Sequence, residues 1–182
     1  SRFKQHSVPE KEVALTWEIE KTGWKIHNHA NVFSRNHLDI GGRFLMDNLP
    51  QGEFSKIVDL GCGNGVVGMA AAQANPQAQV TFIDESYMAV DSARINMLKN
   101  LPEEQSENAR FVVNNGLVGF KAQSYDLILC NPPFHQQQAI TDHIAWSMFN
   151  DARFCLMEGG ELVIVGNRHL DYRDKLNRIF GN

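Results

Sequence analysis

The sequence has few cysteines and no motif that would pair them or bind zinc. Its cysteines are Cys62, Cys130 and Cys155, which form no CxxC motif and each lie in or beside an apolar run. An odd number of such thiols is typical of reduced cysteines in the cytoplasm and argues against a disulfide framework or a structural metal. We therefore expect a cytoplasmic protein without a metal site.

The chain also lacks long hydrophobic runs and an excess of basic residues. It contains no stretch of about 18 uncharged apolar residues, so the sequence predicts neither a membrane span nor a signal peptide. Its 17 lysines and arginines are outnumbered by 21 acidic residues, which gives a net charge of -4. Nucleic-acid-binding domains are usually basic, so this balance is evidence against RNA binding by the domain as a whole.

What is present is the composition of an ordinary globular domain. The 182 residues are 43% hydrophobic and 21% charged, and we find no repeat or low-complexity tract. A chain of this size can bury a core without disulfides or metals. Because the first residue is Ser1 rather than Met, we expect the chain to be a piece of a longer polypeptide.

Short apolar segments alternate with helical segments between positions 57 and 165, which predicts a parallel sheet covered by helices. We expect strands at 56–60, 79–84, 110–114, 126–130 and 161–166, and helices at 66–74, 86–99 and 140–157. Before them, apolar alternation around Gly23 predicts a β-hairpin, and a helix is expected over 38–48. The predicted fold is a Rossmann-like, doubly wound α/β domain at 51–182, with residues 1–50 packed onto it as part of one globular unit.

The strongest local signal is the sequence VDLGCGNG at positions 58–65. It follows an expected strand and precedes an expected helix. Its three glycines, Gly61, Gly63 and Gly65, permit a sharp turn and leave no side chain between the backbone and a ligand. We therefore expect a ligand to approach this loop closely.

Two cofactors compete for this loop. The GxGxxG pattern at 63–68, followed about twenty residues later by Asp84, fits a nicotinamide dinucleotide. That interpretation leaves Asp59 and Gly61 unexplained. S-adenosylmethionine accounts for both, because Asp59 and the backbone of 61–65 lie where its amino-acid end would sit, and the Asp59 carboxylate can pair with the ammonium group there. Asp84 can then accept its two ribose hydroxyls. We favour S-adenosylmethionine, and a loop that binds nothing is the remaining alternative.

A second motif, Asn131-Pro132-Pro133-Phe134, follows the strand expected at 126–130 and should face the same crevice. An exocyclic amine on a base is a poor nucleophile because its lone pair is delocalised into the ring. The Asn131 side-chain oxygen and the Pro132 carbonyl can each accept one N–H and so aim this lone pair. The prolines fix the backbone, and Phe134 offers a face on which a flat substrate can stack.

Both motifs resemble those of the class I S-adenosylmethionine-dependent methyltransferases that act on amino groups. The segment from Phe33-Ser34 to Leu38-Asp39-x-Gly41, taken with Asn-Pro-Pro-Phe-His at 131–135, resembles the bacterial ribosomal RNA guanine-N2-methyltransferases. The segments 135–137 and 167–172 are most similar to members that act on large-subunit RNA. The resemblance covers nearly the whole chain.

This resemblance implies methyl transfer from S-adenosylmethionine to the N2 amine of a guanine in large-subunit ribosomal RNA. The implied catalytic residues are Asn131, Pro132, Pro133 and Phe134. The implied cofactor-binding residues are Phe33, Ser34, Leu38, Asp59, Gly61, Cys62, Gly63, Asp84, Glu85, Met88, Asn114, Asn115 and Asn131.

The family also has an N-terminal domain thought to help hold RNA, and two further strands after the last helix, neither of which this sequence contains. We expect most RNA affinity to come from the N-terminal domain, and we favour a monomer.

Other acceptors remain open: a small-subunit RNA guanine, an adenine, or a glutamine side chain of a translation factor. A noncatalytic binding module is a further alternative. We interpret His27, His29 and His37 as polar strand residues rather than metal ligands.

Overall fold

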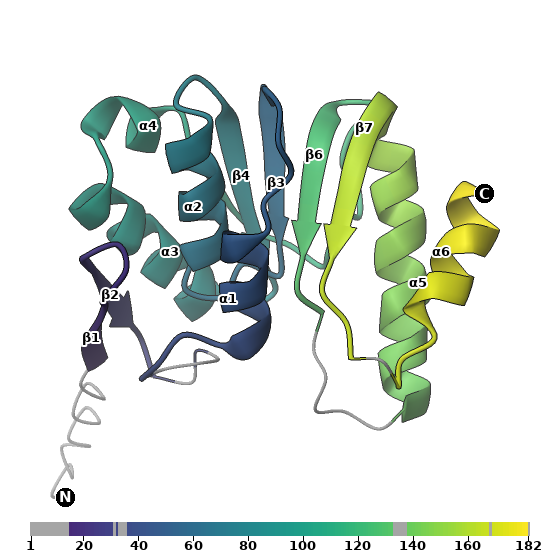
Figure 1. Cartoon of the computed structure of the whole chain (residues 1–182), viewed down its shortest axis with the longest axis horizontal. Helices are drawn as coiled ribbons and strands as arrows, with labels where there is room; N and C mark the ends of the chain where they lie inside the picture. Colours follow the sequence, from purple (N-terminus) through teal and green to yellow (C-terminus); the bar gives the residue numbers. More distant parts are fainter. Residues whose placement is uncertain (1–14, 31, 33–35, 133–137, 168, 182) are drawn as a thin grey trace, which may run out of the picture.

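The computed structural model describes residues 15–30, 32, 36–132, 138–167 and 169–181. Figure 1 shows helices on both sides of a central sheet. A small hairpin near the N-terminus of the chain lies beside α3 (Tyr87–Asn100). Among the described residues, no helix has the length and apolar character needed to cross a membrane. This is the doubly wound α/β architecture that the sequence predicts.

The described part of the central sheet contains five parallel strands. They are β3 (Lys56–Leu60), β4 (Gln79–Asp84), β5 (Arg110–Val113), β6 (Tyr125–Cys130) and β7 (Leu156–Ile164), in the order β5-β4-β3-β6-β7. The chain builds outward from β3 to β5 and then returns to place β6 on the other side of β3. Ligands of such sheets bind beyond the carboxyl ends of the strands at this reversal.

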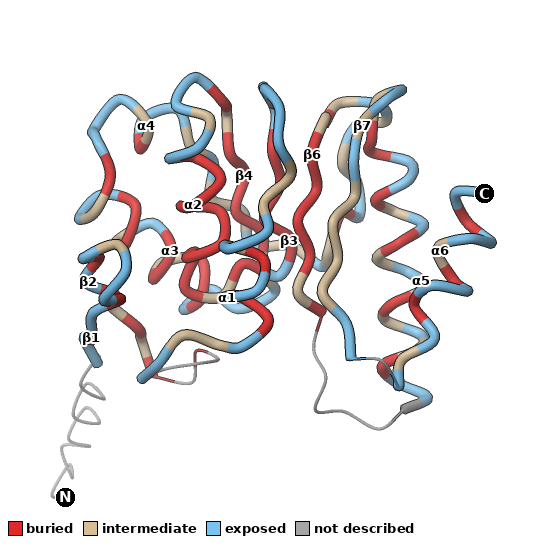
Figure 2. The backbone as a smooth tube through the Cα atoms, in the orientation of Figure 1, coloured by how far each residue is buried: buried red, intermediate tan, exposed pale blue. Residues whose placement is uncertain are grey.

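Alternate strand residues fill two separate cores, as the pleat of a strand requires. Ile57 and Leu127 pack into the core beneath α2 and α3, whereas Val58 and Ile128 pack into the core beneath α5. Figure 2 shows buried residues running along β3, β4 and β6. Strands that are buried on both faces read as continuous apolar runs, which is why the sequence located them.

Six helices are described. They are α1 (Ile40–Asp47), α2 (Val66–Ala74), α3 (Tyr87–Asn100), α4 (Glu103–Glu107), α5 (Gln138–Cys155) and α6 (Tyr172–Phe180). Asp39 is the N-cap of α1, since its carboxylate accepts a hydrogen bond from the Gly42 backbone N–H at 2.9 Å. Ser86 caps α3 in the same way through the Ala89 N–H.

The predicted boundary between the last long helix and the last strand is wrong. The helix expected at 140–157 ends at Cys155, and β7 begins at Leu156 rather than at 161. Leu156 pairs with Tyr125, and the pairing register then shifts before Glu161 pairs with Leu127. Gly159 takes a left-handed conformation, with φ of 77°, in the extra residues of this bulge. The irregular start of β7 has no clear period 2, so the sequence pattern did not reveal it.

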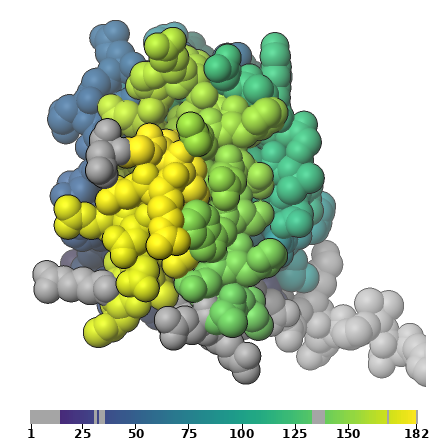
Figure 3. All heavy atoms as spheres, turned by 90° about the vertical axis from the view of Figure 1, so that its right-hand side faces the viewer, coloured from purple at the N-terminus to yellow at the C-terminus, as the bar shows by residue number. Residues whose placement is uncertain are grey.

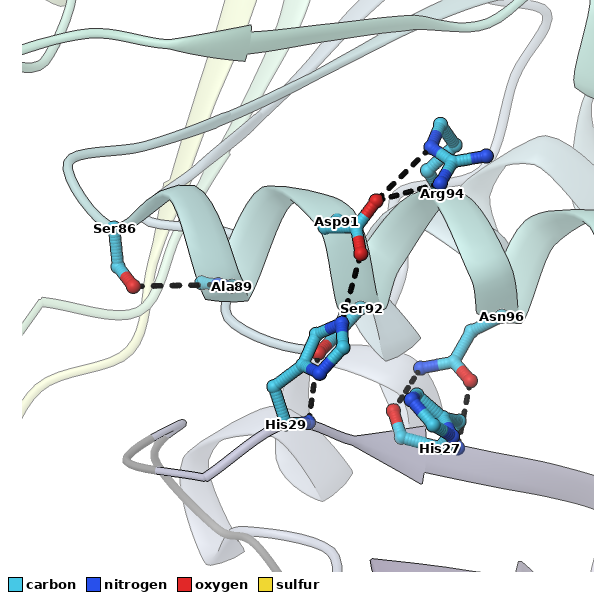
Figure 4. Close-up of polar contacts among 8 residues, drawn as sticks. All are labelled: His27, His29, Ser86, Ala89, Asp91, Ser92, Arg94 and Asn96. Atoms are coloured by element: carbon cyan, nitrogen blue, oxygen red, sulfur yellow. Dashed lines mark hydrogen bonds and ion pairs between the residues drawn. The ribbon is translucent and has the colours of Figure 1, made fainter. Parts of the chain in front are cut away.

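The predicted hairpin is present as β1 (Leu15–Ile19) and β2 (Trp24–Asn28), which pair antiparallel. The second edge of β2 binds side chains of α3 rather than another strand. Asn96 accepts from the His27 N–H and donates to the His27 carbonyl, and Ser92 accepts from the His29 N–H (Figure 4). Asn100 forms the same pair of bonds with the backbone of Lys25. These side chains fix the hairpin on α3.

At the other end of the fold, α6 packs on α5 (Figure 3). Lys175 is buried, and its ammonium lies 3.1 Å from the Asp142 carboxylate and 5.8 Å from the centre of the Trp146 ring. A buried ammonium needs such partners, because burial without them is costly. Strand β7 is the edge of the described sheet on this side and pairs with β6 alone among the strands described.

Candidate active site

A cavity of about 630 Å³ lies at the carboxyl ends of the sheet strands. This volume is within the range of small-molecule sites. The predicted site residues that line it are Leu38, Asp59, Gly61, Cys62, Gly63, Asp84, Glu85, Asn114, Asn115, Asn131 and Pro132. Both sequence motifs therefore contribute to one cavity.

Five predicted site residues are not among those lining residues. Met88 is exposed on the first turn of α3 and does not line the cavity. Phe33, Ser34, Pro133 and Phe134 lie outside the residues that the structure describes.

The glycine loop turns in left-handed conformations at Gly61 and Gly63, where φ is 68° and 52°. A Cβ at either position would face open space, so these glycines are required by the backbone and leave room for a ligand. Two hydrogen bonds tie the loop to β4. The Cys62 N–H donates to the Ile83 carbonyl at 2.8 Å, and the Gly63 N–H donates to Asp84 Oδ2 at 3.0 Å.

Gly68 has a packing role, which a GxGxxG pattern also assigns to its third glycine, so this residue does not distinguish the two cofactors. Its N–H donates to Asp59 Oδ2 at 2.8 Å, and a Cβ at this position would lie only 2.9 Å from the same oxygen. A Cβ there would also collide with the ring of Phe82. The third glycine of the pattern therefore lets α2 approach the carboxylate of Asp59.

Asp59 is a buried carboxyl group at the end of β3, with 4% of its surface exposed. Burial raises its pKa to about 7, the Gly68 hydrogen bond opposes this shift, and the negative charge of Asp84 adds to it. Among the described residues, no basic side chain forms an ion pair with it. A buried carboxyl group that lines a cavity without a cationic partner fits a ligand that carries an ammonium group.

Asp84, at the end of β4, has both carboxylate oxygens oriented by backbone N–H groups. Oδ2 accepts from Gly63 and Oδ1 accepts from Ser86 at 2.9 Å. A carboxylate has about four acceptor positions, so two remain for ligand hydroxyls. This arrangement fits the predicted ribose-binding role.

The two asparagines after β5 differ in their contacts. The Asn114 side chain donates to the carbonyls of Gly116 at 2.9 Å and Val118 at 3.0 Å, so it shapes the loop. Asn115 lines the cavity, and its side chain forms no hydrogen bond with the described residues. Of the two, Asn115 is the better candidate for contact with an adenine edge.

Asn131 lines the cavity from the end of β6. Its Nδ2 donates to Asp39 Oδ2 at 2.6 Å. Its Oδ1 is buried, and no donor reaches it within the described structure. Buried acceptors are rarely left unpaired, so this oxygen fits a site for a ligand N–H.

Sequence reasoning did not assign a site role to Asp39 or to the α5 residues that line the cavity. His143, Ser147 and Asp151 are spaced four residues apart along α5 and all face the cavity. Burial raises the pKa of Asp151. This spacing is readable in the sequence, but nothing there shows that the helix faces a ligand rather than solvent.

All three cysteines are free and buried. Burial raises the pKa of both the Cys62 and the Cys130 thiol, which keeps them protonated and unreactive. No group of three or more potential metal ligands occurs in the described ranges. His29, one of the histidines interpreted from the sequence as not binding a metal, contacts Asp91, with 2.8 Å between Nε2 and Oδ2 (Figure 4).

The fold and these residues define a methyltransferase domain, and the chain belongs to the methyltransferase small domain family, which it matches over residues 23–182. It is 83% identical over 175 residues to ribosomal RNA large subunit methyltransferase G of Psychromonas ingrahamii. It is 59% identical over 174 residues to the protein of the same name from Serratia proteamaculans. Each match covers 96% of this chain and 46% of the relative, so the chain spans about half the length of these relatives.

A solved structure with the same fold is the 16S rRNA N2 methyltransferase RsmC of T. thermophilus in complex with AdoMet and guanosine. Its TM-score is 0.78 at 26% identity, over 93% of this chain and 46% of that one. TrmN from Thermus thermophilus has a TM-score of 0.60 at 23% identity, which shows the shared fold.

Proposed function

We propose that this chain is the catalytic domain of a ribosomal RNA methyltransferase. It transfers a methyl group from S-adenosylmethionine to the N2 amine of a guanine in large-subunit ribosomal RNA. The observation that carries the proposal is the shared cavity, which is lined both by Asn131, whose side-chain oxygen has no donor among the described residues, and by the buried Asp59. The names of the similar proteins support the choice of substrate.

The residues that would hold the methyl donor are those of the glycine loop and the strand ends beside it. Asp59 would bind the ammonium group of the donor, and the positive charge would favour the ionised carboxylate. Asp84 would accept the ribose hydroxyls, while Asn115 would face the adenine edge. S-adenosylmethionine supplies a methyl group bonded to a positively charged sulfur.

The residues that would hold the acceptor are at the end of β6. Asn131 Oδ1 and the Pro132 carbonyl would each accept one N–H of the amine. These two bonds would hold the nitrogen so that its lone pair is aimed at the methyl group rather than delocalised into the ring. The methylated nitrogen is cationic and loses its proton readily, so no strong general base is needed. Pro133 and Phe134 complete the proposed catalytic motif in sequence, outside the described residues.

The guanine must leave its stack to enter a cavity of this kind, so single-stranded or loosely paired RNA is the expected target. With a net charge of -4, the chain is expected to bind RNA weakly by itself. We propose a cytoplasmic enzyme that acts as a monomer on ribosomal RNA.

The test is methyl transfer from labelled S-adenosylmethionine to deproteinised ribosomal RNA by the purified chain, with the modified base identified by mass spectrometry. The proposal expects N2-methylguanine in large-subunit RNA. Methylation of small-subunit RNA, of adenine or of a translation-factor glutamine instead would refute the proposed substrate. Calorimetry that shows binding of NADH and none of S-adenosylmethionine would refute the proposed cofactor.

A further inference from the structure

We propose that Asp39 is a positioning residue for the reaction, which fixes the orientation of the Asn131 amide and thereby leaves its oxygen free for the substrate amine. The inference rests on the proposed function, because it concerns the residue that would hold the acceptor nitrogen. It adds a residue that the two sequence motifs do not contain.

The contact joins two parts of the chain that are 92 residues apart. Asp39 Oδ2 accepts two hydrogen bonds, one from the Gly42 N–H at 2.9 Å and one from Asn131 Nδ2 at 2.6 Å. The first bond begins α1, so the helix holds the carboxylate in place. The second bond is short, as expected where the acceptor is charged.

The chemistry of the two groups determines which end of the amide Asp39 binds. A carboxylate only accepts hydrogen bonds, whereas an amide has one accepting end and one donating end. Asp39 therefore binds Nδ2, and Oδ1 is left without a donor in the described structure. Rotation of the amide by half a turn would place two acceptors against each other. The carboxylate thus excludes the orientation in which Asn131 would offer N–H groups to the N–H groups of its substrate.

Gly41 restricts the same amide from the other side. A Cβ at Gly41 would lie 2.5 Å from Asn131 Oδ1 and 3.1 Å from its Cγ. The φ of Gly41 is not positive, so a side chain is excluded here by space rather than by backbone conformation. The start of α1 therefore supplies both the carboxylate that binds the amide and the surface against which the oxygen rests.

The principal test is Asp39→Asn, assayed with the full chain. Asparagine is as good an N-cap as aspartate, so α1 should form. Its amide can donate as well as accept, so it no longer fixes the orientation of Asn131. We expect kcat to fall by about 10- to 100-fold, while KM for RNA and Kd for S-adenosylmethionine change by less than about twofold.

Gly41→Ala is an independent test that leaves the carboxylate in place. Alanine suits a helix better than glycine, so the helix is not weakened, but its methyl group would displace the Asn131 oxygen. We again expect a loss in kcat. Gly42→Ala is the matched comparison, because its Cβ would meet its nearest neighbours at ordinary distances of 3.7 and 3.8 Å. The loss in kcat for Gly42→Ala should be at least about tenfold smaller than the loss for Gly41→Ala.

A double-mutant cycle separates positioning from a general structural role. If Asp39 acts through Asn131, then Asp39→Asn has no further effect on kcat in an Asn131→Ala background, measured with enzyme in excess over RNA. Losses that simply add would overturn the inference, as would single variants with wild-type kcat. A wild-type chain that transfers no methyl group would instead refute the proposed function, and the inference would fall with it.

Discussion

At the scale of single residues, the protonation of Asp59 determines how the pocket responds to pH. With a pKa of about 7, this carboxyl group is mostly neutral in weakly acidic solution. The proposed donor binds the ionised form through its ammonium group, so binding releases a proton below the pKa.

We therefore expect the affinity for S-adenosylmethionine to rise about tenfold between pH 6 and pH 8. Calorimetry in buffers of different ionisation enthalpy should show proton release at pH 6 and little at pH 8. Asp59→Asn is the control, since it cannot titrate. An affinity of the wild-type protein that stays constant over this range would contradict the assignment of Asp59.

Asp59 also affects the stability of the free protein. The unfolded chain ionises this group near 3.8, but the folded chain does so only near 7. Between these values the folded state binds more protons, so the contribution of Asp59 to the free energy of unfolding falls as pH rises and is lowest above 7.

Asp59→Asn should therefore raise the free energy of unfolding at pH 8 by on the order of 2–4 kcal/mol, and by much less at pH 4. The amide oxygen can still accept from the Gly68 N–H. Urea unfolding of both proteins at the two pH values measures the difference. A variant that is equally destabilised at both would show that the charge is not the cause.

Asn131 is the residue on which turnover depends. Asn131→Ala removes an acceptor for the substrate amine without touching the glycine loop, so kcat should fall by at least about 100-fold. The Kd for S-adenosylmethionine should remain within about twofold. Loss of donor binding together with turnover, or a strongly lowered melting temperature, would indicate a folding role for Asn131 instead.

At the scale of elements, the contact between the hairpin and α3 supports the glycine loop. Asn96 is fully buried, and its Nδ2 donates both to the His27 carbonyl and to the Asn64 carbonyl inside the loop, at 2.9 and 2.8 Å. One side chain thus connects β2, α3 and the loop proposed to bind the donor.

Asn96→Ala should lower the free energy of unfolding by about 2–4 kcal/mol and also weaken binding of S-adenosylmethionine, because it leaves buried backbone groups unpaired. Asn100→Ala is the matched control: it removes the equivalent bonds to Lys25 but does not reach the loop. Chemical unfolding and calorimetry measure the two effects. Equal weakening of donor binding by both variants would argue against a direct link through Asn64.

The elements show where sequence patterns are informative. Strands β3, β4 and β6 were predicted within one residue because they are buried on both faces and lie between glycines or polar turns. The start of β7 was missed because its bulge hides the alternation. Helix α4 was not predicted, since five residues are too few for a helical period to appear.

The candidate site was predictable to the extent that it consists of local motifs. Asp59, Gly61, Gly63, Asp84 and Asn131 were predicted together because parallel strands bring their carboxyl ends to one edge of the sheet. Asp39 and the wall formed by α5 depend on how helices pack against that edge. The sequence shows that Asp39 can begin a helix, but the partner of its carboxylate is 92 residues away.

At the scale of the whole molecule, the cavity is built from chain segments on both sides of the boundary expected at position 50. Leu38 and Asp39 line it together with the strand ends of the sheet. The hairpin, through Asn96, is connected to the same cavity. The first fifty residues therefore contribute to the site as well as to the packing.

A consequence concerns the design of minimal versions of this protein. A fragment trimmed to begin at residue 51 would retain the five described strands of the parallel sheet and the whole glycine loop. It would lack the carboxylate that orients Asn131 and the glycine against which the amide rests. Such a fragment would also lose the hairpin whose His27 carbonyl binds Asn96, so it should bind S-adenosylmethionine more weakly and transfer the methyl group more slowly than the full chain.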